Sequence, residues 1–143
     1  MEQIKANAIL EIVGSPKEHV EETMEKVISM IKENKDFEII KKEISEPNER
    51  EFPNPSKEGE KLQIWSTLAE LEVDFKDFYA LTTFCFDFMP SSIEVLDPAD
   101  LKIGALDTTN ALNDLLARLH QQARVMLEYS ALKKRLAKSN PDN

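Results

Sequence analysis

The chain contains very little cysteine and very little glycine. Its 143 residues include one cysteine, Cys85, and three glycines that lie far apart. One cysteine cannot form an internal disulfide or a cysteine-rich zinc site. The separated glycines argue against the glycine-rich loops that bind phosphate in common nucleotide-binding motifs. No serine-histidine-aspartate set can be recognised either. We therefore assign no catalytic residue, no cofactor and no metal site.

Long apolar runs are also missing. Nowhere do about 18 apolar residues follow one another, so we expect no segment that spans a membrane. The first residues, 1–5, lack the apolar run of a signal peptide. A chain of 143 residues with 41% hydrophobic and 31% charged residues fits a single globular domain. By elimination, we predict a cytoplasmic protein.

Positive charge is scarce in most of the chain. The net charge is −9, but residues 1–106 hold 12 Lys or Arg against 23 Asp or Glu, a net of −11. Residues 107–143 hold 6 against 4, a net of +2. Phosphate backbones attract basic proteins through counterion release. The acidic body is therefore not expected to bind nucleic acid directly.

The first half of the chain predicts two strands around a helix. Residues 4–13 alternate between apolar and polar side chains, which is the period of a half-buried strand. Ser15 and Glu18 have the spacing of a capping box, with a proline between them, and apolar residues then recur at helical intervals. We predict a helix over 16–33 and a second strand over 37–45.

Residues 46–61 are polar and contain three prolines, so we predict an exposed loop. The longest strand pattern follows, over residues 65–75. On its outer face lie Glu70, Glu72 and Asp74, a stripe that could meet a cation or a basic partner but that a solvent-facing sheet surface also explains.

The segment 78–89 has two readings. Its apolar residues fit one side of a helix with Asp77 as the cap, whereas alternating phenylalanines would also suit a strand. We favour the helix, because a connection is needed before the short strand at 93–96. A long helix, capped by Asp107, is predicted to follow.

The predicted order is strand, helix, strand, strand, helix, strand and a long helix, which indicates an α+β protein. Over residues 4–97 this order (βαββαβ) resembles the ferredoxin-like superfold, an antiparallel sheet built from split β-α-β units. We expect residues 1–106 to form this domain. Residues 107–138 would form an added C-terminal helix that packs on the domain and on a partner, and residues 139–143 a disordered tail.

Three residues are candidates for a ligand site between sheet and helices. They are His120, near two arginines, and Cys85 and Asp87, in an aromatic stretch. The simpler interpretation is that Cys85 is a core residue and that the other two are exposed. A small-molecule-binding domain or enzyme is therefore an alternative function.

The long helix is the stronger candidate for a working surface. Its heptad-like positions Leu112, Leu115, Leu119, Met126, Tyr129 and Leu136 are interrupted by Gln122 and Lys133, which disfavours a strict coiled coil. A second apolar stripe, rotated by about a third of a turn, consists of Val125, Tyr129, Leu132 and Leu136, with Lys133 and Arg135 nearby. We predict a non-enzymatic interaction or regulatory module, a homo-oligomer or a binder of another protein through this helix. A further alternative is an acidic adaptor that docks on a basic partner.

Overall fold

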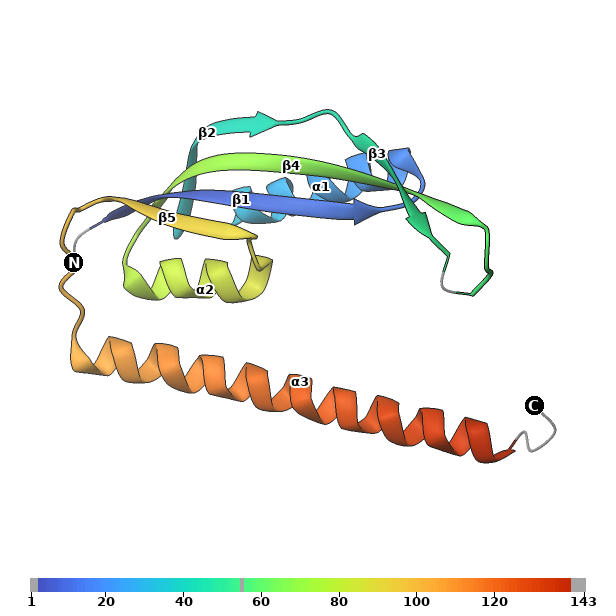
Figure 1. Ribbon diagram of the computed structural model, residues 1–143. Coiled ribbons are helices and arrows are strands. Elements are labelled where there is room, and N and C mark those ends of the chain that lie inside the picture. Colours follow the sequence, from blue (N-terminus) through green and yellow to red (C-terminus); the bar gives the residue numbers. More distant parts are fainter. Residues whose placement is uncertain (1–2, 55, 140–143) are drawn as a thin grey trace. The chain divides into compact units, whose positions relative to one another are not determined.

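A computed structural model describes residues 3–54 and 56–139 of the chain. Within these residues the fold is α+β, a five-stranded antiparallel sheet with three helices, the last of them long (Figure 1). The elements are β1 (Ile4–Gly14), α1 (Lys17–Glu33), β2 (Phe37–Ile44), β3 (Asn48–Pro53), β4 (Lys61–Phe75), α2 (Phe78–Phe88), β5 (Ser92–Asp97) and α3 (Ala105–Ser139). The chain divides into two compact units, one up to Lys102 and one from Ile103 onward.

The sheet of the first unit has the strand order β2-β4-β1-β5, and β3 pairs with the free part of β4. Both β1 and β2 are antiparallel to β4, so these two strands are parallel to each other and α1 connects them. In the same way, β4 and β5 are both antiparallel to β1 and α2 connects them. This is the split β-α-β arrangement that the order of elements predicts.

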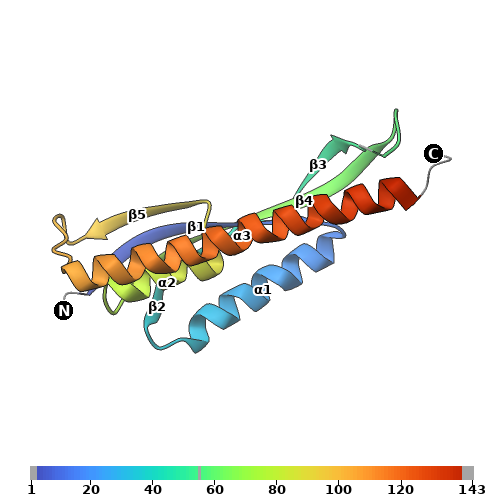
Figure 2. The same ribbon diagram turned by 90° about the horizontal axis from the view of Figure 1, so that it is seen from below.

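The core lies between one face of this sheet and the helices α1 and α2, which both cover that face (Figure 2). The predicted alternation is confirmed, since β1 buries Ile4, Ala6, Ala8 and Leu10 while the residues between them are partly exposed. On β4, Leu71, Val73 and Phe75 are buried in the same way. The helix α1 buries Val20, Met24, Ile28 and Ile31, which recur at helical spacing.

The segment 78–88 is a helix, and the alternative of a strand is wrong. Asp77 caps α2 as predicted, because its carboxylate accepts a hydrogen bond of 2.9 Å from the backbone N–H of Ala80. The helix ends at Met89, whose φ of 45° places it in the left-handed region. Phe84 then packs edge to face against Phe37 and Phe75 from the sheet, with ring centroids 5.5 and 5.2 Å apart.

Part of the predicted loop 46–61 is a strand. Residues 48–53 form β3, which pairs with β4 from Asn48 opposite Ser66 to Pro53 opposite Lys61. β4 begins at Lys61, four residues earlier than predicted, and extends past the end of β2. Its free backbone groups there accept β3 as a partner, although β3 lacks an apolar pattern and all six of its residues are exposed.

Two predicted helix caps are wrong. Pro16 itself occupies the N-cap position of α1, so Ser15 lies one residue too early and no side chain caps this helix. The helix α3 begins at Ala105, and Asp107 lies inside its first turn, where a carboxylate still complements the helix dipole. Of the predicted tail 139–143, Ser139 is the last residue of α3 and the remainder lies outside the described residues.

Candidate interaction surface

The helix α3 presents many large apolar side chains on its surface. Described by itself, it is 35 residues long and has no buried residue. The side chains of the distal stripe predicted from the sequence are between 55% and 66% exposed. They are Val125, Tyr129, Leu132 and Leu136. Exposed apolar patches of this kind on a folded protein mark surfaces that contact other molecules.

Two cationic side chains flank the distal stripe. Successive residues of an α-helix turn by about 100°, so residues 125, 129, 132 and 136 share one side of α3. By the same geometry, Lys133 and Arg135 lie on opposite flanks of the stripe, each about 70–90° from its centre. Their long stems can extend apolar cover while the charged ends stay in water. The distal stripe is therefore an apolar ridge with a basic rim.

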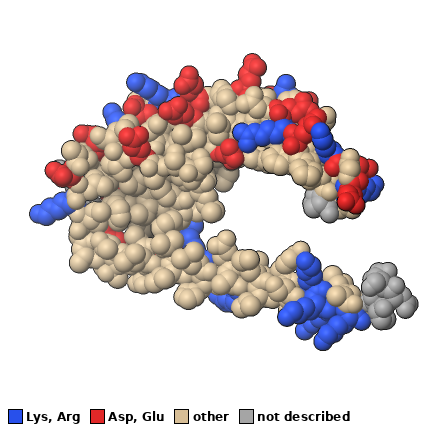
Figure 3. Space-filling view, viewed as in Figure 1, with Lys and Arg blue, Asp and Glu red and all other residues tan. Residues whose placement is uncertain are grey.

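Charge changes sign along α3. The part from residue 105 to 122 holds Asp107, Asp114 and Arg118, a net charge of −1, and Asp114 pairs with Arg118 at 3.1 Å. The part from 123 to 139 holds one carboxylate and five basic side chains, a net charge of +4. Figure 3 shows these Lys and Arg side chains gathered at the C-terminal end of the helix. They complement the negative end of the helix dipole.

A second charged surface lies on the sheet face opposite α1 and α2. Glu70, Glu72 and Asp74 of β4 alternate with the buried residues of that strand, which confirms that they share the outer face. Asn7 of β1 donates a hydrogen bond of 3.0 Å from its Nδ2 to Oε1 of Glu70. Acidic side chains are prominent on this side of the sheet in Figure 3, along its upper margin. The outer face therefore carries negative charge toward solvent.

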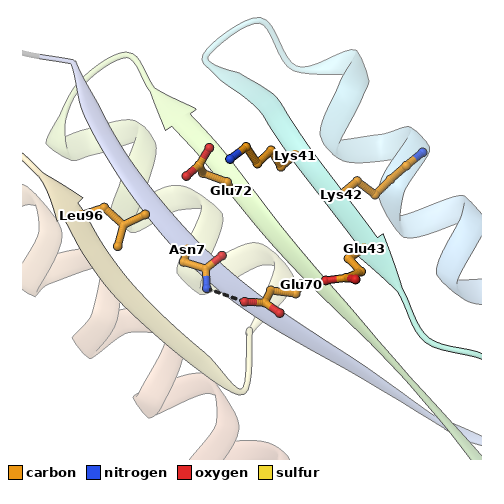
Figure 4. Close-up of a pocket in the computed structure, with 7 residues that line it drawn as sticks. All are labelled: Asn7, Lys41, Lys42, Glu43, Glu70, Glu72 and Leu96. Atoms are coloured by element: carbon orange, nitrogen blue, oxygen red, sulfur yellow. Dashed lines mark hydrogen bonds between the residues drawn. The ribbon is translucent and has the colours of Figure 1, made fainter.

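An open pocket of about 650 Å³ lies on this outer face (Figure 4). It is lined by Asn7, Lys41, Lys42, Glu43, Glu70, Glu72 and Leu96. Strand pairing places Glu43 opposite Glu70 and Lys41 opposite Glu72, and Figure 4 shows Lys41 extending toward Glu72. Asn7, Lys41 and Glu43 were not predicted as site residues. A register shift in β2 between Ile39 and Lys41 decides that Lys41 and Glu43 reach this face, whereas Asn7 reaches it through the regular alternation of β1.

The three predicted ligand residues are not assembled within one unit. Cys85 and Asp87 lie two residues apart on α2, about 200° around the helix, and so face different sides. Cys85 is half-buried against the core, and this burial raises the pKa of its thiol, which disfavours the reactive thiolate. His120 belongs to α3, in the second unit. A ligand site formed by these residues stays a prediction.

Two other kinds of feature, a metal-binding cluster and a membrane-spanning helix, are absent from the described residues. Within residues 3–54 and 56–139, there is no group of three or more His, Cys, Asp or Glu side chains that could hold a metal ion. No helix in this part of the chain is long and apolar enough to cross a membrane. At the end of α1, the Lys42 side chain lowers the pKa of Lys32, because its interaction with the Lys32 amine and its positive charge both disfavour the protonated form.

Comparison with known proteins places this arrangement in a family. Residues 5–137 match the MJ0538 family. The chain is similar to the uncharacterized protein MJ0538 from Methanocaldococcus jannaschii, with 31% identity over 114 residues. The alignment covers 80% of this chain and 38% of that relative, so the chain spans well under half of the relative's length. No solved structure matches the chain. Because the family match takes in nearly the whole sheet and nearly all of α3, the chain belongs to the MJ0538 family.

Proposed function

We propose that the protein is a non-enzymatic interaction module that associates with a second copy of itself through α3. The observation that carries the proposal is the set of eleven large apolar side chains exposed on this one helix. They are Leu106, Leu112, Leu115, Leu116, Leu119, Val125, Met126, Leu127, Tyr129, Leu132 and Leu136. In proteins, a helix gains most of its stability when its apolar face packs against other parts of the structure or against a partner. A helix of this composition is therefore best stabilised by a partner.

The nature of the pocket supports a binding role over catalysis. Catalytic sites exclude water and hold polar groups in fixed positions among apolar walls. The pocket on the sheet is instead lined largely by charged side chains, and Lys41, Lys42 and Glu43 are exposed. We place the module in the cytoplasm as part of the proposal, since a lone cysteine is usual in reducing compartments.

Sedimentation velocity on the full chain tests self-association. We expect the unaltered protein to sediment as a dimer and Leu132→Gln to weaken the dimer by roughly 10- to 100-fold, the loss expected when one buried leucine becomes polar. Ala131→Gln is the matched control, because it introduces the same side chain one residue away and outside the stripe. The proposal fails if the unaltered chain is a monomer at concentrations on the order of 100 µM, or if both variants weaken the dimer equally.

The outer face of the sheet favours a second candidate function, in which the protein is an acidic adaptor for a basic partner. Glu43, Glu70 and Glu72 line one pocket there and Asp74 lies farther along the same strand. Attraction between exposed charges at such a surface falls as salt screens it. Binding of a lysine-rich peptide, measured by fluorescence anisotropy at low and high salt, tests this function.

A double variant localises that binding. Glu70→Gln with Glu72→Gln is expected to weaken peptide binding several-fold at low salt. Glu21→Gln with Glu22→Gln removes the same charge from the exposed surface of α1 and should change binding much less. Equal losses in the two double variants would show that only the net charge matters, and the sheet face would then not be the docking site.

A further inference from the structure

We propose that the two copies pair their α3 helices in antiparallel orientation. The inference rests on the proposed self-association and specifies its geometry. Its basis is the order of apolar and charged side chains along α3. The partner is a second copy of this chain, whose α3 offers the complementary charge at each end.

The seam follows alternate steps of three and four residues along α3. Its positions are Leu112, Leu115, Leu119, Gln122, Met126, Tyr129, Lys133 and Leu136. This spacing has the 3.5-residue period that keeps one side of a helix against a neighbouring helix. Six of the eight positions are large and apolar, and each of those six is exposed on α3 as described by itself. The seam therefore suits helix pairing except at its two polar positions. It shares Tyr129 and Leu136 with the distal stripe, and Leu132 of that stripe borders it next to Lys133.

Lys133 decides between the two orientations. In a parallel pair in register, Lys133 of one copy would lie beside Lys133 of the other inside the seam. Two ammonium groups so close would repel each other where water is partly excluded. In an antiparallel pair centred on the helix, Lys133 would lie near the level of residue 111 of the second copy, about 33 Å along the axis from the other Lys133. A single polar seam position of this kind is known to select orientation and register in paired helices.

The charges outside the seam favour the same orientation. An antiparallel pair sets the half of α3 with net charge −1 beside the half with net charge +4, at both ends. A parallel pair would set the two +4 halves beside each other. Antiparallel helix dipoles also attract each other.

Spin labels on α3 test this orientation in the full chain. Each sample carries one labelled cysteine, Asn110→Cys, Gln121→Cys or Lys138→Cys, in a background of Cys85→Ser. Distances between the two copies are measured by pulsed electron paramagnetic resonance. At 1.5 Å per residue, the antiparallel pair separates labels by about 35 Å along the axis at position 110 and about 50 Å at position 138. Labels at position 121 lie close together.

Each outcome has a distinct meaning. Long, short and long distances at 110, 121 and 138 support the antiparallel pair. Short distances at all three positions overturn the orientation but leave self-association through α3 intact. A monomer in sedimentation, or a dimer with a long distance at 121, instead contradicts the proposed role of α3 itself. Circular dichroism of each sample checks that the Cys85→Ser background is folded.

A charge variant tests the reason for the orientation. In Lys133→Leu the seam loses its ammonium group, so a parallel population is expected to appear as a new short distance at position 138. The matched control is Lys134→Leu, which removes the same charge outside the seam and should keep the long distance. If Lys133→Leu also keeps only the long distance, Lys133 is not the residue that selects the orientation.

Discussion

Phe84 is the side chain whose removal should most clearly weaken the first unit. It lies on α2 with no exposed surface and joins the helix to the sheet. Its ring centroid is 5.2 Å from that of Phe75 and 5.5 Å from that of Phe37, both on strands of the sheet. Within α2 it lies 5.3 Å from the ring of Phe88. Phe84→Ala would therefore leave a cavity among three aromatic rings that belong to rigid elements.

The size of the effect follows from this environment. Replacing a buried phenylalanine by alanine costs about 3–5 kcal/mol, because transfer energy is lost and a cavity remains. The total stability of an ordinary domain is about 5–15 kcal/mol. For a unit of about 100 residues, each kcal/mol shifts the melting temperature by roughly 4–8 °C. Phe84→Ala should thus lower Tm by about 12–40 °C.

Urea unfolding followed by tryptophan fluorescence measures this loss. Trp65 is the chain's one tryptophan and lies on β4, so its signal reports on the first unit. Tyr79→Ala is the control on the same helix, since Tyr79 is 59% exposed and its loss should cost about 0.5 kcal/mol or less. Similar midpoints for Phe84→Ala and Tyr79→Ala would refute the packing of α2 on the sheet described above.

Three further predictions concern single side chains. Burial raises the pKa of the Cys85 thiol, so alkylation at neutral pH should be much slower in the folded protein than in urea and should speed up as the pH rises above 9. Lys42→Gln should raise Tm at neutral pH. Lys42 lowers the pKa of Lys32 in the folded state, which means that it disfavours the charged Lys32 there and so destabilises the fold. The gain in Tm should fade as the pH approaches the ordinary lysine pKa of 10.5, where Lys32 loses its charge in both states. Asp77→Ala should cost about 0.5–2 kcal/mol in urea unfolding through loss of the cap of α2, whereas Asp77→Asn should keep most of that stability.

Strands and helices with a strong period were predictable from the sequence, because the period itself reflects burial on one face. The alternation in β1 and β4 and the stripe of α1 correspond to the buried residues of the structure. α2 was harder, since a short segment rich in phenylalanine fits both periods. The Asp77 cap decides for the helix, and this local signal was already visible in the sequence.

Features that depend on pairing between distant segments were not predictable. β3 has no apolar period, and it is a strand only because β4 extends beyond β2 and offers free hydrogen-bonding groups. The outer-face pocket depends on a register shift in β2, which brings Lys41 opposite Glu72. The faces of α3, in contrast, could be drawn from helical geometry alone.

The two candidate surfaces can be separated because different forces act on them. The proposed association through α3 depends on apolar side chains such as Leu132, so Leu132→Gln should weaken the dimer by roughly 10- to 100-fold while leaving peptide binding at the sheet unchanged. Docking at the acidic face depends on exposed charge, so Glu70→Gln with Glu72→Gln should weaken peptide binding and leave the dimer intact. The effects of the combined variants should then be additive in each assay, as expected for sites without shared contacts. Strong coupling between the two sets of variants would instead contradict two independent sites.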